Sequence, residues 1–148
     1  MSRAAARELA FKIIFQVDIG KNKWQDVLSR SLSEEEDLPE KSRSFLEELV
    51  RGTIRHQNEI DREISQYARD WSLERMANTD RNILRMALFE LKYLSDIPAG
   101  VTVNEAVELA KRYGDVDSGK FVNGILGEIV RTADSGKGPD GITTTTEE

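Results

Sequence analysis

Six basic residues lie within the first thirty positions of the chain, and their side chains could bind an anion. Only three acidic residues accompany them there, whereas the next twenty positions hold seven acidic residues and two basic ones. Salt screens charges beyond roughly 8–10 Å, so a partner responds to this local field more than to the formal net charge of −6. The pattern permits an anionic partner, but by itself it is weak evidence for one, because a charged helix face is usually a solvated surface. The six residues are Arg3, Arg7, Lys12, Lys21, Lys23 and Arg30.

Residues suited to catalysis are scarce. His56 is the only histidine, so a conventional triad would depend on that one position. The chain has no glycine-rich phosphate loop. Glu105 and Glu108 could act as an acid–base pair, but on a helix they are better explained as a capping partner and a surface residue. We therefore expect that the protein is not an enzyme.

Metal and cofactor sites are not predicted either. The absence of cysteine excludes disulfides and thiolate metal sites. Residues 115–119 resemble the start of a calcium loop, but Gly119 and Leu126 stand where that loop needs oxygen ligands. We expect no metal and no cofactor.

Composition indicates a globular protein. The 148 residues suffice for one domain or two small bundles that share a core, and 39% of them are hydrophobic and 32% charged. No apolar run approaches the length of a membrane span, and the first ten positions carry charges where a signal peptide would be apolar. We expect a cytoplasmic protein. Residues 134–148 have almost nothing to bury, which predicts a disordered tail.

Apolar residues recur at helical spacing through most of the chain, and no segment shows the sustained alternation typical of strands. The sequence therefore predicts an all-α fold of about six or seven helices. The predicted helical segments are 2–19, 24–32, 39–68 with a break near 56–58, 78–94, 102–113 and one that begins at Asp117 or Ser118 and ends near 132.

Three helix ends carry recognisable capping residues. Gly20 is expected to end the first helix in a left-handed conformation. Thr102 and Glu105 have the spacing of a capping box, so a helix is expected to begin at Thr102. Asp117 or Ser118 is expected to cap the last helix.

The first helix presents its side chains on two different faces. Arg3 and Arg7 lie one turn apart and off the apolar stripe, so both are expected on one exposed face. Phe11 and Phe15 flank the stripe. We expect Phe11 to lie in the core. Whether Phe15 is also a core residue is left undecided by the spacing.

Three stretches together resemble the NusB family of bacterial transcription antitermination factors. The first is residues 7–10 with Phe15 and Gln16. The second is residues 80–91 followed by Ile97 and Pro98, and the third, the most specific, is 103–111 followed by 120–126. The resemblance extends to about residue 132. The chain departs from the family at Ala4, Ala5 and Ala6, where arginine is often found, at Phe15, where tyrosine is frequent, and in its polar tail.

The resemblance implies two packed helical subdomains, about 1–72 and 73–133. It also implies a function, because NusB-like proteins bind the boxA element of nascent ribosomal RNA leaders together with NusE, a small-subunit ribosomal protein. The pair acts in an antitermination complex that helps RNA polymerase ignore terminators.

The chain offers residues for both implied partners. Basic side chains supply phosphate contacts, an aromatic ring can stack on a base, and an amide can read a base edge. Phe121 could equally be a core residue and Asn123 a buried structural amide. The implied RNA-binding residues are Arg3, Arg7, Lys120, Phe121 and Asn123, with Asp117 nearby, where its carboxylate should repel phosphate. The implied NusE-binding residues are Phe15, Asp80 and Arg81.

Two other functions stay open at this point. One is a NusB-like module of an RNA methyltransferase, which requires a fused catalytic domain that we do not expect here. The other is a helical protein that dimerises and has no RNA partner, and self-association could also bury the RNA-binding face.

Overall fold

A computed structural model of the protein describes residues 1–134. Within them, the chain forms seven α-helices, one short 3-10 helix (η1) and no strand, which confirms the predicted all-α fold. The helix break predicted near 56–58 separates α3 from α4. The predicted disordered tail lies outside the described residues except for Asp134, which ends the last helix. The elements are α1 (Arg3–Gly20), α2 (Trp24–Ser33), α3 (Glu40–Arg55), α4 (Gln57–Tyr67), η1 (Leu73–Arg75), α5 (Asn78–Tyr93), α6 (Ala99–Tyr113) and α7 (Ser118–Asp134).

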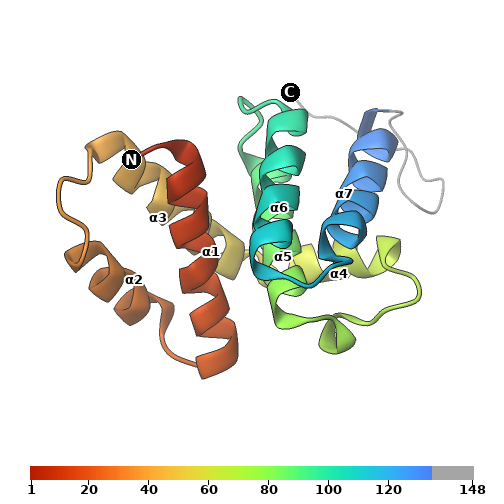
Figure 1. The fold of residues 1–148 in the computed structure, drawn as a ribbon, viewed down its shortest axis with the longest axis horizontal. Helices are drawn as coiled ribbons and strands as arrows, with labels where there is room; N and C mark the ends of the chain where they lie inside the picture. Colours follow the sequence, from red (N-terminus) through yellow and green to blue (C-terminus); the bar gives the residue numbers. More distant parts are fainter. Residues whose placement is uncertain (135–148) are drawn as a thin grey trace.

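The helices form two groups around α5. Helices α1, α2 and α3 pack together on one side, and α4, α6 and α7 lie on the other (Figure 1). Helix α4, which the sequence analysis placed in the N-terminal subdomain, packs against α5 and α7. Helix α5 contacts α1, α3, α4, α6 and α7, and every residue from 82 to 90 is buried. A helix that is buried on all sides is the centre of the core. None of the described helices is long and apolar enough to cross a membrane.

Two capping predictions are wrong. Lys21, not Gly20, adopts the left-handed conformation after α1, with a φ of 58°. Helix α6 begins at Ala99, directly after Pro98, so Thr102 lies inside the helix and does not cap it. The carbonyl of Pro98 already accepts hydrogen bonds from Val101 and Thr102. The Thr102 hydroxyl is therefore free to bond elsewhere.

Gly52 marks the closest approach between α3 and α5. A Cβ atom at this position would lie 2.0 Å from Cζ of Phe89. The Phe89 ring is itself buried and stacks against Tyr93, with ring centroids 5.2 Å apart. The ring has little room to move, so only glycine lets the two helices pack at this spacing.

We predict that Gly52→Ala destabilises the fold by about 1–3 kcal/mol, because the added methyl group overpacks the core. Urea unfolding followed by circular dichroism measures the change. Gly127→Ala is the matched control, since a Cβ there meets nothing within 4 Å. It should raise stability by roughly 0.5–1 kcal/mol through helix propensity. Equal effects of the two substitutions would contradict the packing argument.

Candidate functional site

Arg7 is a buried structural residue. Its Nε and Nη2 atoms donate to the two carboxylate oxygens of Glu90, at 2.9 and 2.7 Å. The side chains of Arg7 and Glu90 are only 4% and 1% exposed. The Thr102 hydroxyl donates to the same carboxylate at 2.5 Å. The prediction that Arg7 lies on an exposed face is wrong, because its guanidinium neutralises a carboxylate buried in α5.

Arg3 is exposed, as predicted, and its guanidinium lies over the ring of Phe45, 4.7 Å from the centroid. Helix α1 begins at the upper left of Figure 1, whereas α7 begins beyond α6 on the right (Figure 1). Helix α1 packs mainly on α2, α3 and α5, whereas α7 packs mainly on α4, α5 and α6, so the fold does not pack the two helices that carry Arg3 and Lys120 side by side.

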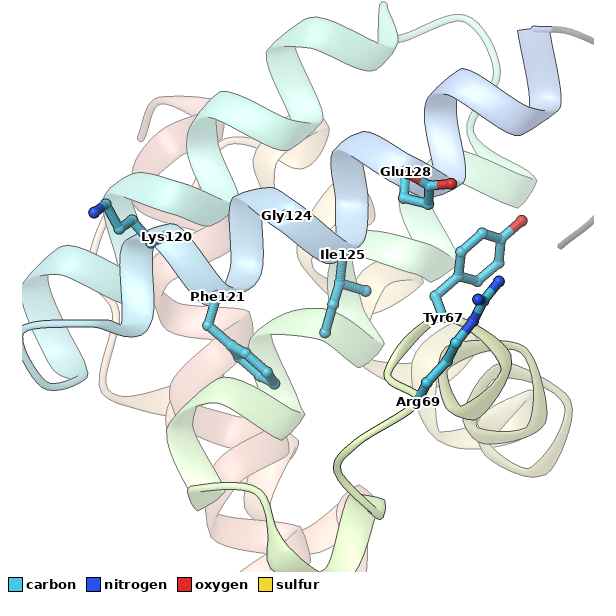
Figure 2. Close-up of a pocket in the computed structure, with 7 residues that line it drawn as sticks. All are labelled: Tyr67, Arg69, Lys120, Phe121, Gly124, Ile125 and Glu128. Carbon is cyan, nitrogen blue, oxygen red and sulfur yellow. The ribbon is translucent and has the colours of Figure 1, made fainter.

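A groove of about 500 Å³ runs along α7 and contains Lys120 and Phe121. Figure 2 shows these two residues toward one end, Ile125 in the middle, and Tyr67, Arg69 and Glu128 at the other end. Lys120 and Arg69 are exposed, and neither takes part in an ion pair or side-chain hydrogen bond within residues 1–134. A cation thus lies at each end of the groove, with the Lys120 ammonium directed away from Phe121 and Arg69 at the same end as the Glu128 carboxylate (Figure 2).

Phe121 and Asn123 differ in their surroundings. Phe121 is half-buried, packs against the core and also lines the groove, so the two interpretations of this residue are both partly right. Asn123 is exposed, which excludes a buried structural amide. Its amide is available to a ligand on the solvent side of α7.

The turn before α7 is held by its own polar groups. The Ser118 hydroxyl accepts a hydrogen bond from the backbone N–H of Asp115 at 3.0 Å. A carboxylate oxygen of Asp115 accepts one from the N–H of Asp117, also at 3.0 Å. Asp117 is exposed, and its carbonyl accepts from the N–H of Phe121. Asp117 therefore precedes α7 at the position predicted, with its side chain close to Lys120 in sequence.

A second, smaller recess of about 220 Å³ contains Phe15. Phe11, Lys12, Thr79 and Tyr113 also line it, so α1, α5 and α6 all contribute. The Tyr113 hydroxyl donates to Glu8, and this hydrogen bond lowers the pKa of the Glu8 carboxyl. The rings of Phe11, Phe15 and Tyr113 contact one another in this recess, which suits an apolar side chain of a protein partner.

Asp80 and Arg81 are less accessible than predicted. Asp80 is 7% exposed, and its Oδ1 atom has no hydrogen-bond partner within the described residues. Burial raises the pKa of the Asp80 carboxyl, and Asp115 adds to the rise while the Ser118 hydroxyl opposes it. Arg81 donates to Asp18 at 2.7 Å and to the carbonyl of Leu73 at 3.0 Å. The expectation that Asp80 offers a free surface charge is therefore wrong.

Three residues at the second end of the groove were not predicted from the sequence. Tyr67 ends α4, Arg69 follows it, and Glu128 lies two turns into α7 beyond Phe121. Nothing in the sequence brings α4 beside α7. Only their packing against each other and against α5 does so.

The fold and these two recesses define a helical binding protein. The groove offers cations and an aromatic ring, and the smaller recess offers an apolar pocket. Within residues 1–134, no group of three or more histidine, aspartate or glutamate side chains is placed to hold a metal ion.

Comparisons with known proteins give the family. The model of the NusB family matches residues 4–131. The transcription antitermination protein NusB of Desulforamulus reducens is 45% identical over 134 residues, 90% of this chain and 93% of the relative. The protein of that name in Bacillus subtilis is 44% identical over 129 residues, 87% of this chain and 95% of the relative.

Solved structures agree with this result. The structure of NusB from T. maritima matches with a TM-score of 0.83 and 39% identity, over 88% of this chain and 92% of that one. A chain in a crystal structure of the antitermination factors NusB and NusE with dsRNA matches with a TM-score of 0.80 and 29% identity, over 89% of this chain and 99% of that one. The chain belongs to the NusB family, a family of transcription antitermination proteins and not of enzymes. The predicted family and the predicted lack of enzymatic activity are thereby confirmed.

We predict that Arg7→Ala destabilises the protein by about 3–5 kcal/mol, because it leaves the Glu90 carboxylate buried without its cation. Chemical unfolding at neutral pH measures the loss. Arg3→Ala is the control: its exposed guanidinium should contribute no more than about 1 kcal/mol. If Arg7→Ala is as stable as Arg3→Ala, the buried ion pair does not hold the helices together.

We predict that Asp80→Asn raises stability at neutral pH by roughly 1 kcal/mol, because it replaces a buried carboxylate that lacks one partner. The raised pKa means that ionisation of Asp80 costs folding free energy, and this cost grows as the pH rises above the unfolded-state pKa and is complete above the folded-state pKa. The gain should therefore shrink as the pH falls toward 3.8, the ordinary value for this carboxyl. Unfolding curves at neutral and acid pH measure it, and a less stable variant at neutral pH would contradict the assignment.

Proposed function

We propose that this protein binds boxA RNA and NusE at two separate surfaces and acts in the cytoplasm within an antitermination complex that includes RNA polymerase. The observation that carries the proposal is the α7 groove, whose two cations lack partners within residues 1–134. Most other basic residues near the core are already neutralised, as Arg7, Arg81 and Arg85 are by Glu90, Asp18 and Asp61.

The groove has the chemistry that unpaired RNA requires. Lys120 can contact a phosphate, and the half-buried ring of Phe121 can stack on a base. Asn123, one turn from Lys120 on α7, does not line the groove, but its exposed amide can read a base edge of an RNA that extends past it. Arg3 is a separate phosphate contact at the start of α1. Arg7 is left out of the RNA-binding surface, because its guanidinium is bound to Glu90.

The recess around Phe15 is the proposed contact for NusE. Its aromatic walls can hold an apolar side chain, and Asp80 and Arg81 begin the neighbouring helix α5. Asp80 can receive a basic group only if that group reaches its buried carboxylate. Support for the partner comes from the fold, which matches a chain of the solved complex of NusB and NusE with dsRNA.

The proposal predicts that RNA binding and NusE binding can be weakened separately. Lys120→Ala should weaken binding of a boxA single strand and lower the salt slope by about 0.7, one phosphate contact, without changing NusE affinity. Phe15→Ala should weaken NusE binding by about 1–3 kcal/mol, as an aromatic anchor does, without changing the affinity for RNA alone.

Anisotropy titrations with labelled RNA and calorimetric titrations with NusE measure the two effects, and unfolding curves show whether each variant is folded. Arg30→Ala is the control, because Arg30 is an exposed residue of α2 that lines neither recess. The proposal fails if Lys120→Ala and Phe15→Ala each leave both affinities unchanged.

A further inference from the structure

The groove along α7 is longer than one base. Phe121 and Glu128 are seven positions apart, about 10 Å along a helix that rises 1.5 Å per residue. Stacked bases repeat at about 3.4 Å along a strand. A base that stacks on Phe121 therefore leaves the end formed by Tyr67, Arg69 and Glu128 for a nucleotide about three stacking steps further along the strand (Figure 2).

The side chains at this end have complementary hydrogen-bonding chemistry. Glu128 can only accept hydrogen bonds when it is ionised, and Arg69 can only donate them. The Tyr67 ring forms a wall between them, and its hydroxyl is held by a hydrogen bond of 2.6 Å to Thr132. An aromatic wall, an acceptor and a cation together suit a base and its phosphate better than they suit an apolar side chain.

Glu128 can be released for a ligand at small cost. Its present partner is Arg131, one turn further along α7, and the two side chains are 44% and 69% exposed. An exposed pair of this kind contributes little stability. A base edge that reaches the carboxylate can therefore replace the guanidinium.

The carboxylate distinguishes among the four bases. Only guanine presents two adjacent donors on its Watson–Crick edge, from N1 and the N2 amino group, and these match the two oxygens of a carboxylate. Adenine and cytosine present one amino group next to an acceptor, and uracil presents one N–H between two acceptors. We propose that Tyr67, Arg69 and Glu128 form a guanine-selective subsite for a nucleotide about three stacking steps along the strand from the one on Phe121, an inference that rests on the proposed RNA-binding function.

The test uses the full chain and three short single-stranded RNAs: an oligouridylate, the same strand with one central guanosine, and the same strand with inosine there. Inosine lacks the N2 amino group and so removes one of the two donors. Wild-type protein should bind the guanosine strand about fivefold or more tightly than the other two, the lower end for a bidentate contact. Glu128→Gln should abolish this preference while it leaves the affinity for oligouridylate within a factor of two.

Two further variants separate the possible results. Glu48→Gln removes an exposed carboxylate from α3, far from the groove, and should keep the preference. Arg69→Ala should weaken binding of all three strands by similar factors, because its cation serves the phosphate. The subsite is overturned if Glu128→Gln keeps the preference for the guanosine strand. It is also overturned if the wild-type protein binds all three strands without that preference. If Lys120→Ala still weakens oligouridylate binding, the RNA surface stands without the subsite. If no strand binds, both the subsite and the RNA-binding function are wrong.

Discussion

The buried contact between Arg7 and Glu90 constrains how three helices at the centre of the molecule pack. It joins α1 to α5, and the Thr102 hydroxyl adds α6 to the same carboxylate. A carboxylate that is 1% exposed is stable only if a cation and further donors surround it, which restricts how these three helices can pack. Both recesses depend on this packing, because α1 and α6 line the smaller one and α7 is packed on α6 and α5.

The basic residues of the described chain therefore have two different roles. Those near the junction of the two helical groups form ion pairs with internal carboxylates. Arg81 pairs with Asp18, and Arg85 pairs with both Asp18 and Asp61. Those on the groove, Lys120 and Arg69, have no such partner within residues 1–134. A protein with an excess of acidic residues can in this way still present a locally positive surface, since screening limits the range of the remaining charge.

Helical periodicity predicted the fold well, because a buried stripe follows from spacing along a single helix. The same reasoning failed for Arg7, which lies off that stripe and would normally face solvent. Its partner is 83 positions away in the sequence, and no local pattern signals such a contact. The apparent capping box at Thr102 failed for a related reason. Pro98 lets the helix begin one turn earlier, and the threonine hydroxyl bonds to a buried side chain instead.

The candidate site could be predicted only in part, because half of it comes from one helix and half from another. Lys120 and Phe121 are neighbours in the sequence, so their common location in the groove was evident, whereas Asn123, predicted with them, lies on α7 outside the groove lining. Tyr67 and Arg69 reach the same groove only because α4 packs against α7, and this contact depends on the tertiary fold.

Asp80 is a buried charge that lowers the stability of the fold. Its carboxylate is buried at the start of α5, close to Ser118, the first residue of α7, and burial raises its pKa. Stability alone would favour a neutral side chain there, because one carboxylate oxygen has no partner within the described residues. Thr53, whose hydroxyl is also buried without a partner within the described residues, is a second such position, so local packing alone does not account for every buried polar group of the fold.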